Sequence, residues 1–208
     1  MVARTNKLAS LGTNSSPGSP ILSASAGGYG NTNWYFDDTE FGYGGAGVGL
    51  TGMQAVIQAG CSSNSVTYTN VYPDVGNDHI YKGTNVVGYI SWGFHSYLNR
   101  WYALDGSVKW FGNSGWYLIE TIESDNGQQY SDCGNVIFWY ESNAFGGTNY
   151  SNTPIGAVSD VDEPYTYGAC NPAKYFGLWA AGKNFGICAW AAVNSDKFQA
   201  VGDPFVQK

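Results

Sequence analysis

Residues 85–91 have the sequence NVVGYIS, a nearly continuous apolar run with the length of one β-strand. An apolar run without polar alternation is typical of a central strand that a parallel sheet buries on both faces. Residues 116–122 (WYLIETI) have the same character. Shorter apolar runs occur at 34–36 (WYF), 155–159 (IGAVS) and 198–201 (FQAV). These five segments predict the strands of a sheet.

Helical patterns separate several of these runs. Residues 49–59 (GLTGMQAVIQA) have apolar residues at helical spacing. Residues 132–142 can form a second helix, with Val136, Ile137 and Tyr140 on one face. Because strands that alternate with helices imply βαβ units, these patterns predict an α/β fold with a mostly parallel sheet covered on both faces.

A third helical region is predicted near the C-terminus. It begins at Asn171 and Pro172, since Asn is a good N-cap and Pro suits the first helical position. Gly182 interrupts this region, which then resumes to about Ala192. Residues 65–69 (SVTYT) alternate and are rich in β-formers, so they predict one more strand.

The composition indicates one compact, mildly acidic domain. The 208 residues include 9 Lys and Arg against 16 Asp and Glu, a formal charge of −7, and 16% are aromatic. A basic nucleic-acid binder is excluded, because such a protein needs Lys and Arg to displace counterions from phosphates. We expect a single α/β domain at 34–208, preceded by an irregular lead-in at 1–33 that is rich in Gly, Ser, Asn and Pro.

The location of the protein stays open at this point. No apolar run approaches the length that spans a bilayer, so membrane insertion is not expected. Residues 1–10 lack the apolar core of a signal peptide, which taken alone favours the cytoplasm. The abundance of Asn, Ser, Thr, Tyr and Gly favours an exported protein. A disulfide is then an option for Cys61, Cys133 and Cys170, whereas Cys188 is expected to be a buried free thiol.

Polar residues follow most of the predicted strands directly. In parallel sheets ligands bind beyond the carboxyl ends of the strands, near the point where the strand order reverses. The candidate binding residues at these ends are Asp37, Asp38, Trp92, Glu123, Asp125 and Asn126. We therefore expect a binding site at the carboxyl edge of the sheet.

His95 and Ser124 follow two adjacent central strands and are the candidate catalytic residues. An imidazole beside a hydroxyl is the minimal pairing for nucleophilic catalysis, since the imidazole removes the hydroxyl proton. Asp125 or Asp160 would orient this base. The alternative is that His95 is a polar loop residue and Ser124 a turn former.

Carboxylates after the strand at 155–159 offer a different use of the same edge. Asp160, Asp162 and Glu163, with the acids at 37 and 38, can supply the all-oxygen shell that Ca²⁺ or Mg²⁺ prefers. A cation would relieve the repulsion between them. No loop with EF-hand spacing accompanies these residues, and the alternative is that they are solvated acids. No other cofactor is expected.

The aromatic residues of 92–117 suggest a further alternative. Exposed Trp and Tyr rings can form a stacking platform for sugars, because each ring has an apolar face and a polar tip. This hypothesis requires Trp101 or Trp110 to be exposed. The alternative is that most of these rings pack in the core.

Several stretches together resemble a known family. They are WYFDD (34–38), NVVGYISWG (85–93), SGWYLIETIES (114–124), NAFGGTNYSNTPIGAVSDVDEP (143–164), YFGLWAAGKNFGICAW (175–190) and FQAVGDPFV (198–206). In this order they resemble an uncharacterised family of exported bacterial proteins. The resemblance implies that the chain is the C-terminal part of a longer exported protein.

The predicted strands and the closing Gly-Asp-Pro at 202–204 also resemble the gingipain and caspase-like peptidases, whose fold is a three-layer sandwich with a flavodoxin-like strand order. In that fold the catalytic His follows the third strand and the catalytic Cys follows the fourth. His95 falls near the first position. The second falls near Glu123 and Ser124, where there is no Cys, and Cys133 comes about nine residues later. The resemblance therefore implies a peptidase-like fold without the thiol nucleophile.

The sequence thus predicts a degenerate, non-catalytic peptidase-like domain that binds a ligand, such as a peptide or glycan, at the carboxyl edge of its sheet. The first alternative is a hydrolase of peptidase type that uses His95 and Ser124. The second is a carbohydrate-binding surface formed by Trp and Tyr in 92–117.

Overall fold

The computed structural model describes residues 33–36, 70–73, 82–91, 94–95, 100–101, 108–129 and 136–208. The strands of its largest sheet are β1 (Asn33–Phe36), β2 (Asn70–Pro73), β4 (Val86–Ser91), β8 (Leu118–Thr121), β9 (Gly156–Asp160) and β10 (Phe198–Gly202). Their order across the sheet is β10-β9-β8-β4-β1-β2. All neighbours are parallel except β9 and β10, which are antiparallel. The protein is therefore a mixed α/β protein with a mostly parallel sheet, as the sequence predicts.

Two small sheets accompany the large one. Strand β3 (Lys82–Thr84) pairs in parallel with β7 (Lys109–Phe111), and β5 (Phe94–His95) pairs antiparallel with β6 (Arg100–Trp101). None of these four short strands is among those predicted from the sequence. Strands of two or three residues are too short to show a hydrophobic period, so their pairing depends on contacts made elsewhere in the fold.

The helical region near the C-terminus is confirmed in detail. Helix α4 (Pro172–Ala180) begins at the expected N-cap, where the Asn171 side chain accepts a hydrogen bond from Lys174 N at 3.0 Å. Gly182 has φ +75°, a left-handed conformation that suits glycine and ends the helix. Helix α5 (Phe185–Ala192) then begins with Asn184 as its N-cap. A short helix, α3 (Tyr165–Gly168), precedes both.

The helix predicted at 132–142 is wrong for the part that the structure describes. Residues 136–142 form turns around a single 3-10 helix, η2 (Phe138–Tyr140), and a second one follows, η3 (Ala144–Gly146). Val136 and Trp139 are buried, whereas Ile137 is 41% exposed. Because residues three apart eclipse each other in a 3-10 helix, Val136 and Trp139 point to the same side, and Ile137 does not join them.

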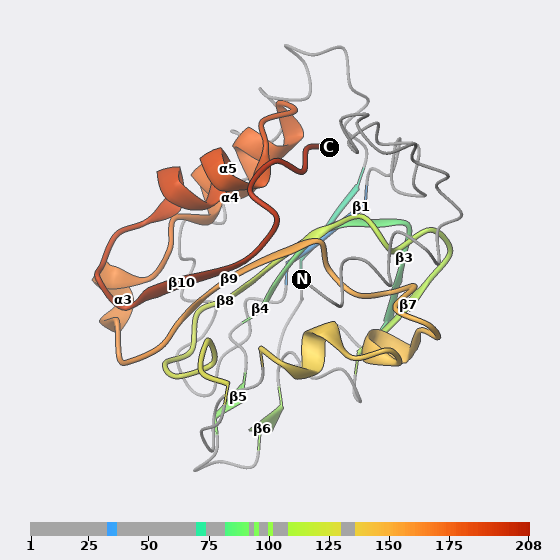
Figure 1. The fold of residues 1–208 in the computed structure, drawn as a ribbon, viewed down its shortest axis with the longest axis horizontal. Helices are drawn as coiled ribbons and strands as arrows, with labels where there is room; N and C mark the ends of the chain where they lie inside the picture. Colours follow the sequence, from blue (N-terminus) through green and yellow to red (C-terminus); the bar gives the residue numbers. More distant parts are fainter. Residues whose placement is uncertain are drawn as a thin grey trace.

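The large sheet has a packed core on each face. Helices α4 and α5 cover one face, where Tyr175, Phe176 and Trp179 pack on Leu118 and Val158. The 3-10 turns (yellow in Figure 1) and the β7 strand cover the other face, in a core formed by residues such as Tyr89, Trp110, Tyr117, Trp139 and Phe145. The apolar strands therefore have both faces buried, which explains why they lack polar alternation.

Two predicted elements lie outside the described residues. These are the helix at 49–59 and the strand at 65–69; strand β2 begins directly after the latter, at Asn70.

Candidate functional site

Adjacent parallel strands bring the candidate site segments to one edge of the sheet. Strands β4 and β8 pair with Ser91 opposite Thr121, and β8 pairs with β9 with Glu120 opposite Val158. The loops at 122–129 and 161–164 therefore leave the same carboxyl edge. Asp37, Asp38 and Trp92 lie outside the described residues, and so does the side chain of His95. A His95–Ser124 pairing stays a prediction.

Ser124 lies in a tight turn directly after β8. Its hydroxyl donates a hydrogen bond to Glu123 Oε1 at 3.0 Å, and its backbone N–H donates to the same oxygen at 3.1 Å. Asn126 is buried and its side chain donates to Ser124 O at 3.1 Å. Asp125 has φ +64°, a left-handed conformation that Asp tolerates in turns. Three of the predicted binding residues thus build the turn that holds Ser124.

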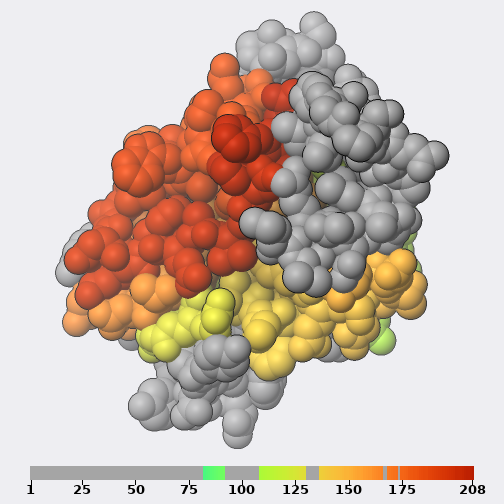
Figure 2. Space-filling view, in the orientation of Figure 1, coloured from blue at the N-terminus to red at the C-terminus, as the bar shows by residue number. Residues whose placement is uncertain are grey.

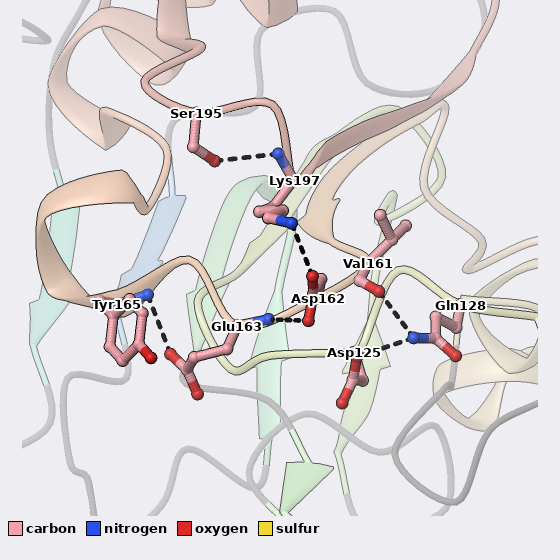
Figure 3. A network of polar contacts seen from close by, with 8 residues as sticks. All are labelled: Asp125, Gln128, Val161, Asp162, Glu163, Tyr165, Ser195 and Lys197. Atoms are coloured by element: carbon pink, nitrogen blue, oxygen red, sulfur yellow. Dashed lines mark hydrogen bonds and ion pairs between the residues drawn. The ribbon is translucent and has the colours of Figure 1, made fainter.

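The turn is attached to the end of β9. Gly127 N–H donates to Asp160 O at 2.8 Å, and a Cβ at Gly127 would lie 3.0 Å from that oxygen, so a larger residue would be crowded here. Gln128 Nε2 donates both to Asp125 Oδ1 at 2.7 Å and to Val161 O at 2.6 Å. The two loops of the carboxyl edge are therefore linked by hydrogen bonds (Figure 3).

A second set of contacts links the 161–164 loop to the segment before β10. Lys197 Nζ lies 2.7 Å from Asp162 Oδ2, and this partly exposed ion pair holds the pKa of Asp162 below its usual value. Asp162 also accepts a hydrogen bond from Glu163 N, and Glu163 accepts one from Tyr165 N, each at 2.9 Å. Figure 3 shows that the Asp162–Lys197 pair joins the two segments, whereas Glu163 bonds within its own loop.

The three carboxylates predicted as metal ligands do not converge. Asp160 is buried at the end of β9, whereas Asp162 and Glu163 are exposed and hydrogen-bonded as described above. In the part of the chain that the structure describes, no group of three or more His, Cys, Asp or Glu side chains is arranged to hold a metal ion. A cation site at this edge therefore gains no support from these residues.

Two buried carboxylates in the sheet were partly missed by sequence reasoning. Glu120 was not among the candidates, and Asp160 was predicted only as a metal ligand or as the group that orients the base. Both are fully buried, and none of their four oxygens has a hydrogen-bond partner among the residues that the structure describes. Burial raises the pKa of Glu120 well above its usual value, and the Asp160 charge raises it further. Burial likewise raises the pKa of Asp160 to about 7. A glutamate inside the apolar run WYLIETI was the signal that could have identified Glu120.

The Trp and Tyr side chains that the structure describes in 92–117 do not form a stacking platform. Trp110 and Trp116 are each 2% exposed and Tyr117 is fully buried. The Trp110 ring stacks on Phe145 at 5.8 Å and meets the edge of Tyr89 at 4.9 Å, while its Nε1 donates to Tyr117 Oη at 3.1 Å. The expectation that Trp110 is exposed is therefore wrong, because this ring packs in the core against Phe145 and Tyr89. The Trp101 side chain lies outside the described part.

A cavity of about 830 Å³ extends from the opposite edge of the sheet to Gln129, which ends the described part of the 122–129 loop. Its lining includes Trp116 and Ile155, which precede β8 and β9, together with Val201 and Gly202 at the end of antiparallel β10. These positions mark the edge where the parallel strands begin. No sequence motif pointed to this cavity, since its lining comes from four separate segments of the chain.

No protein-family model, curated protein or solved structure matches the chain. Among the described residues no helix has the length and apolar character needed to cross a membrane.

Proposed function

We propose that this chain is a caspase-like, three-layer α/β domain of an exported protein that binds a basic peptide at the carboxyl edge of its sheet without cleaving it. The observation that carries the proposal is the hydrogen bonding of Ser124, whose hydroxyl is held by Glu123 Oε1 at 3.0 Å. Ser124 occupies the place after the fourth strand of the large sheet, where the peptidases that the sequence resembles have their nucleophile.

The strand order supports the fold assigned in this proposal. Numbered along the chain, the strands of the large sheet lie in the order 2-1-3-4-5-6, with the sixth antiparallel to its neighbour. The first five have the flavodoxin-like order of doubly wound sheets, whose ligands bind where the order reverses. Here the order reverses between β1 and β4, which pair with Phe36 opposite Ile90. Layers on both faces of the sheet agree with a three-layer sandwich.

The environment of Ser124 supports a role without catalysis. A serine nucleophile needs a general base that accepts its proton. In the part of the chain that the structure describes, the only hydrogen bond of the Ser124 hydroxyl goes to the adjacent Glu123. The buried Cys170 is no substitute, because burial raises the pKa of its thiol far above neutrality and keeps it protonated.

The charge of the edge supports a basic ligand. Glu163 and Asp196 are exposed there, and Asp125 is half-buried. Lys197, which is the one cation among the described residues of these loops, is already paired with Asp162. Complementary charges increase the association rate and reject like-charged partners, so a peptide that contains Lys or Arg is favoured over an acidic one.

Peptide binding and cleavage can be measured in one experiment. Fluorescein-labelled basic and acidic peptide pools are titrated with the full chain by fluorescence anisotropy, and the peptides are then checked for cleavage by mass spectrometry. We expect only the basic pool to bind, and to remain intact. Glu163→Gln, which keeps an oxygen for Tyr165 N, and Asp196→Asn should each weaken binding by about two- to fivefold.

Glu141→Gln is the matched control, because Glu141 is an exposed carboxylate at the opposite edge and should leave peptide affinity unchanged. The absence of binding to the basic pool, or equal binding of both pools, would overturn the proposal. Cleavage that Ser124→Ala abolishes would overturn it in favour of a hydrolase.

The hydrolase that uses His95 and Ser124 remains the second candidate. It is favoured by the pairing of β4 and β8, which continues through a hydrogen bond from Ile122 N to Ser91 O at 3.2 Å. The segments that carry His95 and Ser124 therefore leave neighbouring strand ends. A fluorophosphonate probe tests this candidate directly: labelling of the wild type that both His95→Ala and Ser124→Ala abolish would support it, and equal labelling of all three would exclude it.

A further inference from the structure

We propose that the cavity at the amino edge of the sheet, opposite the peptide site proposed above, binds a neutral saccharide. Its volume of about 830 Å³ lies within the range of small-molecule sites. Figure 2 shows the face on which the segment that begins at residue 136 (yellow) borders the C-terminal segment (red), and both segments line the cavity. The chemistry of the lining changes from the floor of the cavity to its rim.

The buried floor of the cavity is mostly apolar. Its buried residues include Trp116, Val136, Pro154 and Val206. Trp116 is held in place by a hydrogen bond from its Nε1 to Gln207 O at 3.2 Å. An apolar floor of this kind suits the C–H face of a sugar ring, because apolar surface is removed from water on both sides.

Two half-buried tyrosines form part of the wall. The Tyr140 hydroxyl donates to Val201 O at 2.8 Å, which orients its ring between the 3-10 turn and β10. The Tyr150 hydroxyl has no hydrogen-bond partner within the described part of the chain. Tyr150 therefore offers both a ring for stacking and a free donor and acceptor for a sugar hydroxyl.

The rim is polar and its groups are unoccupied. Gln129, Glu141, Ser142 and Asn143 are exposed, and in the described part of the chain none of their side chains makes a hydrogen bond. At the carboxyl edge, by contrast, the side chains of Asp125, Asp162 and Glu163 all make hydrogen bonds. Because sugar hydroxyls both donate and accept, a rim with amide, hydroxyl and carboxylate groups can satisfy them.

The charge of the lining indicates a neutral ligand. Glu141 and Asp203 are acidic, and no Lys, Arg or His is among the described lining residues, so an anionic sugar or phosphate would be repelled. Asp203 already accepts a hydrogen bond from Phe205 N at 2.8 Å. Three of the four unoccupied rim groups are neutral, which favours a neutral saccharide over an organic cation.

The wall is held in place before any ligand binds. Asn149 and Tyr150 have φ +51° and +64°; Asn tolerates this left-handed conformation, but it is uncommon for Tyr. Tyr150 N donates to Ser142 O at 2.9 Å, and Thr153 Oγ1 donates to Tyr150 O at 3.0 Å, which keeps the segment in this conformation. A preorganised tyrosine loses little entropy when a sugar stacks on it.

Saturation-transfer NMR with the full chain tests the proposal. The panel contains glucose, galactose, mannose, N-acetylglucosamine and their common disaccharides, with glucuronate and tetramethylammonium as charged probes. We expect at least one neutral sugar to bind and glucuronate not to bind. In titration calorimetry with that sugar, Asn143→Ala should weaken binding about two- to tenfold, and Tyr150→Ala about tenfold.

Tyr165→Ala is the matched control, because Tyr165 is a 61% exposed tyrosine at the carboxyl edge. It should leave sugar affinity unchanged. Asn143→Ala lies on the surface and keeps the test valid if Tyr150→Ala fails to fold. The proposal is overturned if no neutral sugar binds more tightly than about 10 mM, if tetramethylammonium binds instead, or if sugar binding survives both cavity variants. None of these outcomes bears on the peptide site, whose variants lie at the other edge.

Discussion

Glu120 and Asp160 lie on the same face of the adjacent strands β8 and β9, and both carboxyl groups are fully buried, with no hydrogen-bond partner in the described part of the chain. Leu118 and Val158, two residues before them, pack in the core beneath α4 and α5, and residues two apart share a strand face. Two acids in this core are costly when charged, so each stays protonated to a higher pH than in the unfolded chain.

This arrangement makes folding stability depend on pH. The unfolded chain loses the Asp160 proton near the usual pKa of 3.8, whereas the folded chain keeps it up to about 7. Between these values the folded state binds more protons, so stability falls as the pH rises. We expect the Tm from circular dichroism to decrease from about pH 5 to about pH 8.

Asp160→Asn and Glu120→Gln remove the titrating groups and should flatten this dependence. At the alkaline end each variant should be more stable than the wild type by roughly 1–3 kcal/mol, because it carries one buried charge fewer. Asp162 does not interfere, since Lys197 lowers its pKa and it titrates below this pH window. A pH dependence that is the same in both variants and in the wild type would contradict the assignment.

Asn152 should be essential for the loop that follows η3. Its buried amide donates to Trp110 O at 2.9 Å and to Phe145 O at 3.0 Å. Asn152→Ala removes both bonds, and we expect the free energy of unfolding in urea to fall by about 2–4 kcal/mol. Asn143→Ala, an exposed change at the residue before η3, should stay within about 0.5 kcal/mol. Equal effects of the two variants would refute the role given to Asn152.

Gly156 is required because Phe185 packs directly on it. A Cβ at Gly156 would lie 2.5 Å from the Phe185 ring. Gly156→Ala should therefore destabilise the protein by about 1–3 kcal/mol, and Phe185→Leu should offset part of that loss in a double-mutant cycle. Gly182→Ala serves as the comparison, since a Cβ there meets no atom within 4 Å and only the φ of +75° opposes it. It should show no coupling to Phe185→Leu.

Cys170 and Cys188 should be unreactive until the protein unfolds. The side chains are 2% and 0% exposed, and burial raises the pKa of Cys188 to about 12. Only the thiolate reacts readily. Peptide mapping after iodoacetamide treatment should find both residues unmodified in the native protein and modified in denaturant; rapid native modification of either would contradict this burial.

Local sequence features were sufficient for several elements. The apolar runs at 85–91 and 155–159 became β4 and β9, and the break at Gly182 separates α4 from α5 as expected. Such features report the preferences of a few adjacent residues, so no distant contact is needed to interpret them. The sequence also showed that acids follow several strands, but it did not show which residues they bond to.

Contacts between distant segments decided which side chains are buried and where the cavity lies. The sequence by itself determined a mostly parallel α/β sheet, the start of α4, and a chain poor in positive charge. Only the tertiary structure decided that Trp110 packs inside against Phe145, that Glu120 and Asp160 are buried together, and that four separate segments enclose a cavity at the amino edge. The physical reason is that burial and strand pairing depend on contacts between residues tens of positions apart. The free energy of such contacts cannot be derived from a local sequence pattern.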